Sequence, residues 1–269
     1  KIFDNVTQIG GLGGELCYLI EGSEKALLID GLTGVGSLKA FVRECTDLPV
    51  TLVLTHGHVD HAGASFEYGE CYVNPADVAL LYEHGDIDKR YGFVMGGGKP
   101  EGVFVPKKED VVPPCAVKTL PVQDGDVFDL GGVQIEAIAV PGHTVGTMVY
   151  LDRARRVLYS GDACNANTLL GLPCSTTVET YAKSLDHLAT YLKGIDKFYG
   201  GHGLQAVPAY IVDEAMILCE EILSDDDDRF ETEFLGRKFL YARKFDGMFH
   251  REDGGIANIA YVMEKVYNK

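Results

Sequence analysis

The chain has 269 residues, of which 46% are hydrophobic and 24% are charged, a composition typical of a globular protein with one large domain or two small ones. No run of about 18 apolar residues occurs, which excludes a transmembrane helix. The formal net charge of −16 disfavours a nucleic-acid partner, because affinity for a phosphate backbone comes from Lys and Arg. Part of the acidity is a run of aspartates at 225–228, which we interpret as a solvated helix end.

Seven cysteines lie along the chain, an odd number with wide spacing and no Cys-x-x-Cys pair. This pattern favours reduced thiols in a cytoplasmic protein over a framework of disulfides. No secretory segment opens the chain, but its first residue is Lys1 rather than Met, which leaves open a leader that was removed. We expect a small-molecule substrate, with neither nucleic acid nor a membrane as a partner.

Short apolar runs near the start predict strands at 6–9, 16–20 and 26–29. The glycine-rich residues 10–14 join the first two strands. They superficially resemble a phosphate-binding loop, but since they join strand to strand we interpret them as a flexible hairpin at the rim of an active site. Residues 34–46 have the spacing of an amphipathic helix. Four apolar residues would form the buried face of that helix: Val35, Leu38, Phe41 and Val42.

The next segment carries the densest group of potential metal ligands in the chain. A β-branched apolar strand at 50–54 runs into Thr55, and His56-Gly57-His58-Val59-Asp60-His61 follows directly. The small residues at 62–65 suit a helix start, so the cluster sits on a strand-to-helix loop where side chains can converge. Neutral imidazole is the commonest metal ligand in proteins, and carboxylate is a good partner for divalent ions. The pattern therefore predicts a metal site rather than a chance group of polar residues.

The interval that follows begins regularly, with a strand at 71–73 and a helix at 75–83, and then loses its pattern. Residues 92–100 are rich in glycine and carry apolar side chains. Long irregular loops in compact domains are often functional, so we hypothesise a lid loop at about 84–112, with a mobile surface loop as the alternative. Three side chains of this lid would face the substrate: Tyr91, Phe93 and Met95.

Three further strands end in glycine-containing turns that carry a histidine or an aspartate. Residues 135–140 lead to His143, 156–159 lead to Asp162, and 197–199 lead to His202. In open α/β architectures, ligands bind outside the carboxyl ends of strands, so four such strand ends form a pattern that scattered histidines would rarely produce.

The second half repeats the order of strands followed by helices. Thr176 and Glu179 match a capping box before a helix through about residue 193, and Pro208 suits the first turn of a helix through about residue 223. His187 lies within the first of these helices and is interpreted as a surface residue. The tail at 229–269 alternates aromatic, basic and apolar residues and contains strand candidates.

The pattern His-x-His-x-Asp-His, followed by separate His, Asp and His residues, resembles the metallo-β-lactamase superfamily over nearly the whole chain. The resemblance implies the α/β class, with a four-layer αββα sandwich as a single domain over 1–269. It also implies two metal sites. Seven side chains would be the ligands: His56, His58 and His143 for the first ion, Asp60, His61 and His202 for the second, and Asp162 as a bridge between both.

Other residues near this pattern are expected to support the ligands rather than to bind the ions themselves. Asp30 matches the family's early aspartate, which is structural, so we do not count it as a ligand. Because Asp162 is present where the commonest true β-lactamases lack it and use a cysteine, the site looks more like glyoxalase II and the lactonases. Cys164 is interpreted as a packed thiol or one close to the metals. Thr144 and Ser160 are candidates for fixing ligand orientation, or ordinary turn residues.

We therefore expect a dinuclear metal-dependent hydrolase, with Asp60 and Asp162 as catalytic residues and a bridging hydroxide that attacks a small ester, lactone, thioester or phosphoester. The cofactors would be two divalent metal ions, zinc first, with iron or manganese as alternatives. The tail looks too strand-like and too short for the helical domain of glyoxalase II. The alternative function is an iron-dependent oxidoreductase of the persulfide dioxygenase or di-iron reductase type, and a third is a binding protein that has lost the chemistry.

Overall fold

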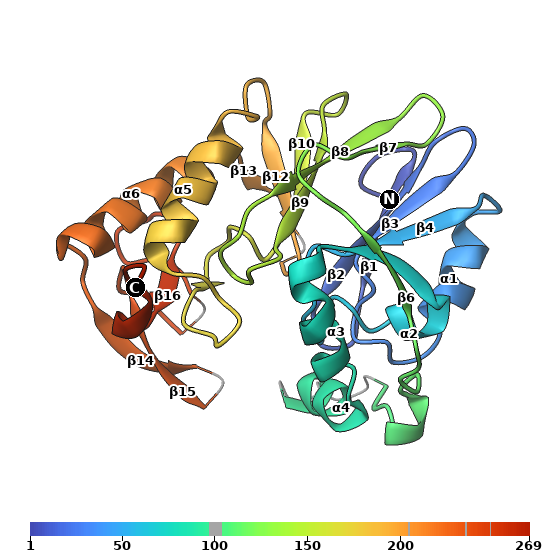
Figure 1. Cartoon of the computed structure of the whole chain (residues 1–269), viewed down its shortest axis with the longest axis horizontal. Helices are drawn as coiled ribbons and strands as arrows, with labels where there is room; N and C mark the ends of the chain where they lie inside the picture. The colour runs from blue at the N-terminus through green and yellow to red at the C-terminus, as the bar shows by residue number, and fades with distance from the viewer. Residues whose placement is uncertain (97–103, 204, 235, 248) are drawn as a thin grey trace.

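The computed structural model of the chain describes residues 1–269 except 97–103, 204, 235 and 248. Two mixed sheets lie side by side at its centre, and helices lie on their outer sides (Figure 1). The first sheet has its six strands in sequence order: β1 (Val6–Gly10), β2 (Leu16–Glu21), β3 (Ala26–Ile29), β4 (Val50–Val53), β5 (Glu70–Val73) and β6 (Lys118–Pro121).

The second sheet comes from the second half of the chain. Its strands follow one another in space as β13 (Val207–Pro208), β12 (Lys197–Gly200), β10 (Val157–Gly161), β9 (Met148–Asp152), β8 (Gln134–Ala139) and β7 (Val127–Asp129). A smaller third sheet gathers the tail, in the order β11 (Thr168–Leu169), β16 (Ile259–Tyr261), β15 (Arg237–Tyr241) and β14 (Phe230–Phe234). The strand-like tail is thus confirmed, while its pairing with β11 was not foreseen.

Helices flank both large sheets. Their bounds are α1 (Leu38–Cys45), α2 (Ser65–Tyr68), α3 (Val78–His84), α4 (Ile87–Gly96), α5 (Val178–Ala189) and α6 (Ile211–Ser224). Short 3-10 turns are η1 (Pro75–Asp77), η2 (Lys108–Asp110) and η3 (Met263–Lys265). None of the helices in the described part of the chain is long and apolar enough to cross a membrane.

The side chains of β2 show why four layers form, because successive residues of a strand point to opposite faces. Leu16, Tyr18 and Ile20 belong to the core between the two large sheets, and Cys17 and Leu19 belong to the core beneath α1 and α3. The strand β9 divides in the same way between the central core and the core beneath α5 and α6. The expected αββα sandwich is therefore confirmed.

The interval expected to be irregular, 84–112, is partly helical, because it contains α4 and the short turn η2. Arg90 explains this helix: its side chain is fully buried and donates a hydrogen bond to the carbonyl oxygen of Val112. That anchor offsets the cost of about 1 kcal/mol for Gly92 inside a helix. Residues 97–103 lie outside the described residues, and the lid stays a prediction. The three side chains assigned to the lid all lie on α4: Tyr91, Phe93 and Met95.

The first helix is shorter than its amphipathic pattern. Gly34 and Gly36 have φ angles of 70° and 73°, a left-handed conformation, so α1 begins only after Ser37, whose hydroxyl accepts the N–H of Ala40. Phe41, which we assigned to the buried face, is 47% exposed. The helix predicted from the apolar pattern therefore included residues 34–37, which the two glycines keep non-helical.

Three assignments in the second half also change. The residue that caps α5 is Thr177 rather than Thr176, because its hydroxyl accepts the N–H of Thr180 at 3.2 Å. Pro208 lies in the edge strand β13 rather than in the first turn of a helix. Within the acidic run, Asp227 is not solvated, since its side chain is buried and accepts the hydroxyl of Tyr261 at 2.7 Å. The seven cysteines are all free thiols, as expected.

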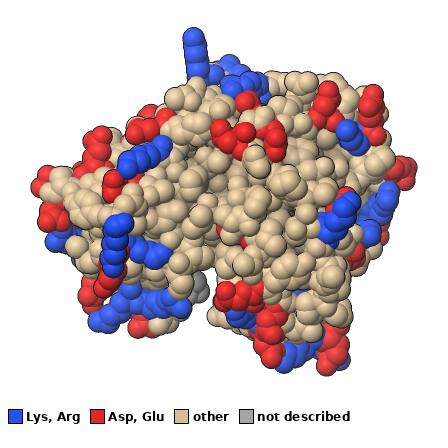
Figure 2. Space-filling view, viewed as in Figure 1, with Lys and Arg blue, Asp and Glu red and all other residues tan. Residues whose placement is uncertain are grey.

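Charged side chains of both signs lie mainly around the margin of the face shown in Figure 2, and an indentation at its lower edge separates two lobes. In Figure 1 the hairpin of β14 and β15 lies on one side of this indentation, and α4 lies on the other. The loops that follow β4, β8, β10 and β12 come together between the two lobes (Figure 1).

The two large sheets are joined by a hydrogen bond from the buried Tyr150 of β9, whose hydroxyl donates to the carbonyl oxygen of Leu54 at 2.8 Å. We expect Tyr150→Phe to lower the free energy of unfolding by about 1–3 kcal/mol, because that carbonyl would remain buried without a partner. Urea denaturation measures the change. The control is Tyr210→Phe at a residue that is 53% exposed, for which we expect less than about 0.5 kcal/mol. Equal effects of the two variants would contradict the prediction.

Candidate metal centre

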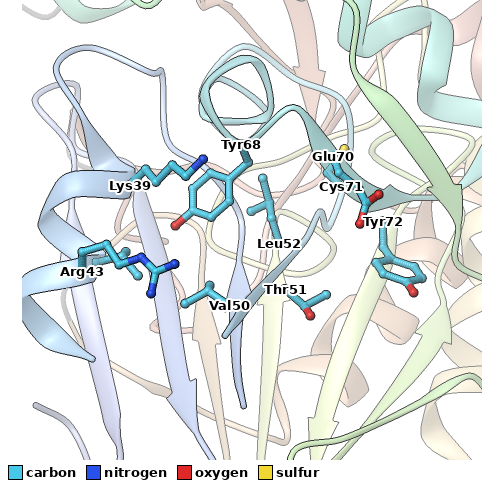
Figure 3. Close-up of a pocket in the computed structure, with 10 residues that line it drawn as sticks. Lys39, Arg43, Val50, Thr51, Leu52, Tyr68, Glu70, Cys71 and Tyr72 are labelled. Atoms are coloured by element: carbon cyan, nitrogen blue, oxygen red, sulfur yellow. The ribbon is translucent and has the colours of Figure 1, made fainter. Parts of the chain in front are cut away.

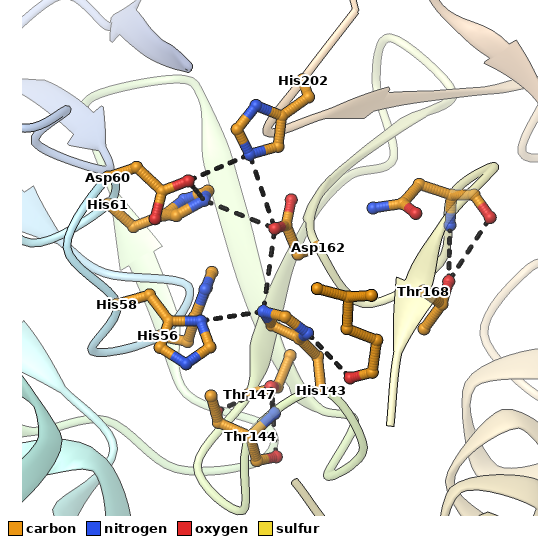
Figure 4. Close-up of polar contacts among 12 residues, drawn as sticks. His56, His58, Asp60, His61, His143, Thr144, Thr147, Asp162, Thr168 and His202 are labelled. Carbon is orange, nitrogen blue, oxygen red and sulfur yellow. Dashed lines mark hydrogen bonds and ion pairs between the residues drawn. The ribbon is translucent and has the colours of Figure 1, made fainter. Parts of the chain in front are cut away.

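The loop from His56 to His61 begins shortly after β4, where the chain leaves the first sheet. Thr55 still follows the strand direction, and its carbonyl oxygen accepts the N–H of Met148 at the start of β9 (2.8 Å). The N–H groups of His61 and Ala62 then turn back to the carbonyl oxygen of His58. This tight turn places side chains of the loop toward the turns that follow β8, β10 and β12 (Figure 4).

Three of the expected ligands form one buried group: His56, His58 and His143. The Nδ1 of His58 lies 2.9 Å from the Nε2 of His143, and the three rings are at most 6% exposed. Burial lowers the pKa of all three imidazoles, and neighbouring imidazoles lower it further for His56 and His58. The rings are therefore neutral near pH 7, which is the form that binds a metal ion.

The other four form a second group: Asp60, His61, Asp162 and His202. The Nε2 of His202 lies 3.0 Å from Asp60 Oδ2 and 3.5 Å from Asp162 Oδ2. Burial alone would raise the pKa of both carboxyl groups, yet His61 and His202 hold it well below the usual value. In return, and against the effect of burial, these carboxylates raise the pKa of His202 to about 10. The second group is thus built around ionised carboxylates that require positive charge.

Asp162 lies between the two groups. Its Oδ2 is 3.7 Å from the Nε2 of His143 in the first group and 3.7 Å from the Nε2 of His61 in the second (Figure 4). Gly201 permits this close arrangement, because a Cβ atom there would lie 2.8 Å from Asp162 Oδ1. The structure therefore brings together all seven side chains named from the sequence.

The outer nitrogens of the imidazoles are held by neighbouring groups. His61 Nδ1 lies 2.8 Å from Asp30 Oδ2, and Asp30 also accepts the N–H and hydroxyl of Thr55. The Nδ1 of His143 lies 3.0 Å from the carbonyl oxygen of Leu169 in β11. Such contacts fix the ring orientation and the tautomer of a ligand. Asp30 thus has the supporting position that the resemblance implied.

Two residues beside the first group were not identified from the sequence. The ring of His84 stacks on that of His58 at 5.1 Å, and its Nδ1 accepts the N–H of Val59 at 3.1 Å. Cys174 Sγ lies 3.1 Å from His58 Nε2. His84 ends a helix and Cys174 lies in an irregular segment, so neither follows a strand, which was the signal that identified the ligands.

The remaining candidates are also placed. Cys164 is buried and points its thiol toward the carbonyl oxygen of Ile211, as expected of a packed residue. Thr144 donates its hydroxyl to Asp77 at 2.7 Å, whereas the hydroxyl of Ser160 has no partner among the described residues. His187 lies 3.0 Å from Asp124, apart from both groups, as expected of a surface residue.

The donor set fits divalent cations. Three atoms of the two groups are buried yet have no hydrogen-bond partner within the described ranges: His56 Nε2, His61 Nε2 and Asp162 Oδ1. Buried polar atoms are normally paired, and a cation would supply the missing partner. Imidazole nitrogens together with carboxylate oxygens are ligands that zinc, iron and manganese all accept.

A separate pocket lies at the other end of the first sheet (Figure 3). Lys39 and Arg43 of α1 line it together with Thr51 near the start of β4 and Tyr68 at the end of α2. Because the histidine loop leaves the opposite end of β4, this pocket is distinct from the candidate metal centre.

Residues 10–202 match the family model of the metallo-beta-lactamase superfamily. Acyl-coenzyme A thioesterase MBLAC2 from Gallus gallus is 29% identical over 201 residues, which cover 69% of this chain and 71% of the relative. The Homo sapiens protein of that name is 28% identical over 203 residues, with the same coverage of 69% and 71%.

Two solved structures are also similar. A metallo-beta-lactamase family protein from Thermus thermophilus has a TM-score of 0.59 and 22% identity, and the match covers 84% of this chain and 82% of that one. TTHA1623, solved in a di-iron-bound form, has a TM-score of 0.53 and 26% identity, with coverage of 78% and 96%. The first likeness concerns the fold alone. Since the family model spans most of the sequence, the chain belongs to the metallo-beta-lactamase superfamily.

Proposed function

We propose that this protein is a metal-dependent hydrolase that cleaves a small thioester, or a chemically similar ester or lactone. The observation that carries the proposal is the pair of adjacent groups of potential ligands, with Asp162 of the second group 3.7 Å from His143 of the first. The relatives named acyl-coenzyme A thioesterases favour the thioester among these substrates. Phosphoesters rank lower because the names of these relatives specify a thioester.

Each of the two groups would bind one of two divalent ions. When bound, such ions polarise a substrate carbonyl and lower the pKa of water from about 15.7 towards ~7. His56, His58 and His143 offer neutral nitrogen atoms to one ion. Asp60 and Asp162 would offer negative charge, which would balance the charge of the cations.

The more open side of the site indicates how a substrate reaches it. The side chain of His202 is 38% exposed, whereas those of His61 and His143 are 0% and 3% exposed. The glycine-rich residues 10–14 lie beside His202, because Glu15 forms a β-bridge with His202 and Leu16 donates its N–H to Gly201. We infer that the substrate enters past His202 and this hairpin.

Metal content is the first prediction. Protein purified without added metal is expected to carry about two divalent ions per chain by elemental analysis. Chelation is expected to lower the melting temperature, because ions that bind only the folded state stabilise it by about 2.7 kcal/mol at a concentration 100-fold above Kd. Re-addition of the ion should restore the melting temperature. A protein that contains no ion and does not respond to added Zn²⁺, Mn²⁺ or Fe²⁺ would contradict the proposal.

Activity of an Asp162→Ala variant is the second prediction. We expect hydrolysis of a short acyl-coenzyme A thioester to fall by more than the 10–100-fold typical for groups that only support ligands, since Asp162 is the carboxylate proposed to bind both ions. Metal content should fall in parallel. The matched control is Asp186→Ala, at an exposed position on α5, which should leave activity unchanged. Full activity of the Asp162 variant would refute the bridging role.

An iron-dependent oxidoreductase remains the second candidate. The similarity to TTHA1623, a protein with a di-iron-bound form, favours keeping it. One or two iron ions per chain, with oxygen uptake in place of thioester hydrolysis, would select this function over the hydrolase.

A further inference from the structure

Asp77 is a buried carboxylate that the proposed ligand set does not include. It is the last residue of η1, directly after β5, and is 2% exposed. The chain reaches this position through Asn74, whose carbonyl oxygen accepts the N–H of Asp77 at 2.9 Å. Since β5 is the neighbour of β4 in the first sheet, η1 lies beside the start of the histidine loop.

The carboxylate of Asp77 joins two loops that carry ligands. Its Oδ2 accepts the N–H of Gly57, between His56 and His58, at 2.9 Å. The same oxygen accepts the hydroxyl of Thr144 at 2.7 Å, and Oδ1 accepts the N–H of Gly146 at 2.9 Å. The two latter donors belong to the turn that follows His143 in the chain.

A carboxylate suits this position better than a neutral side chain. Three donors from two loops point at its two oxygen atoms, and an asparagine would offer one oxygen and direct an NH₂ group at a donor. The loops also approach Asp77 closely. A Cβ atom at Gly57 would lie 2.7 Å from the carbonyl oxygen of Asp77, and one at Gly146 would lie 2.6 Å from Asp77 Oδ1. Glycine at both positions therefore permits the contact.

We propose that Asp77 is a positioning residue that sets the separation of the His56–His58 loop from His143 and so determines the metal affinity of the first ligand group. The inference rests on the proposed metal-dependent function. His58 Nδ1 and His143 Nε2 come from these two loops and lie 2.9 Å apart, and the side chain of Asp77 accepts hydrogen bonds from both loops at once. The hydrogen bonds of Asp77 go to Gly57, which lies between two ligands of the first group, and to the turn that follows His143, so the affinity of the second group serves as an internal reference.

The test titrates metal-free protein with Zn²⁺ in competition with a chromophoric chelator, and follows Co²⁺ absorption in parallel. We expect Asp77→Asn to weaken one of two sites by about 10–100-fold and to leave the other unchanged. The variants His56→Ala and His202→Ala identify which group is affected. Asp77→Asn should weaken binding at the same site as His56→Ala does, but by a smaller factor.

A matched control separates positioning from general stability. Asp152 is also a fully buried aspartate, lies at the opposite end of β9 from the metal centre, and pairs with Arg155. Asp152→Asn should lower the melting temperature without changing either metal affinity. If Asp77→Asn does not fold, Gly146→Ala carries the test, because its new methyl group would push against Asp77 and should weaken the same site.

Three results would overturn the role of Asp77. These are affinities within about threefold of the unmodified protein, an equal loss at both sites, or the pattern of His202→Ala. If the unmodified protein itself binds neither Zn²⁺ nor Co²⁺, the proposed function fails first, and the role of Asp77 fails with it.

Discussion

Two hydrogen bonds across the joint between the sheets decide where the candidate metal centre can form. The N–H of Met148 and the hydroxyl of Tyr150, both from β9, donate to the carbonyl oxygens of Thr55 and Leu54. Leu54 and Thr55 directly follow β4. Their carbonyl oxygens are therefore bonded by a strand of the second sheet at the point where the pairing of the first sheet ends. The histidine loop is thereby held against the turns that follow β8 and β10.

The ligand positions were predictable because each follows an apolar strand. Carboxyl ends of strands in α/β sheets meet at one edge, so His56, His143, Asp162 and His202 could be expected to converge from sequence alone. The apolar run at 16–20 likewise predicted the strand β2, whereas the strand β9 and the division of both strands between two cores are findings of the structure. The metal-binding roles of these side chains stay predictions, whereas their proximity is a feature of the structure.

Other features depend on contacts between distant residues, which a local pattern does not contain. Asp77 and His84 do not lie in a turn that follows a strand and carries a ligand. They contact the candidate metal centre through hydrogen bonds from donors in loops 20 or more residues away. The helix α4 looked irregular because its glycines weaken the pattern, while its anchor Arg90 reaches a carbonyl 22 residues further on. Caps such as Thr177 differ from their neighbours only in geometry.

The short strand β11 connects His143, which lies within the residues that match the family model, to the tail, which lies beyond them. The carbonyl oxygen of Leu169 holds His143, and Leu169 itself pairs with Ala260 of β16, beyond the matched residues 10–202. The ring orientation of His143, a candidate ligand within residues 10–202, thus depends on a strand that pairs with the tail outside those residues. A substitution in the tail can therefore shift the ring of His143 without touching any of the seven candidate ligands.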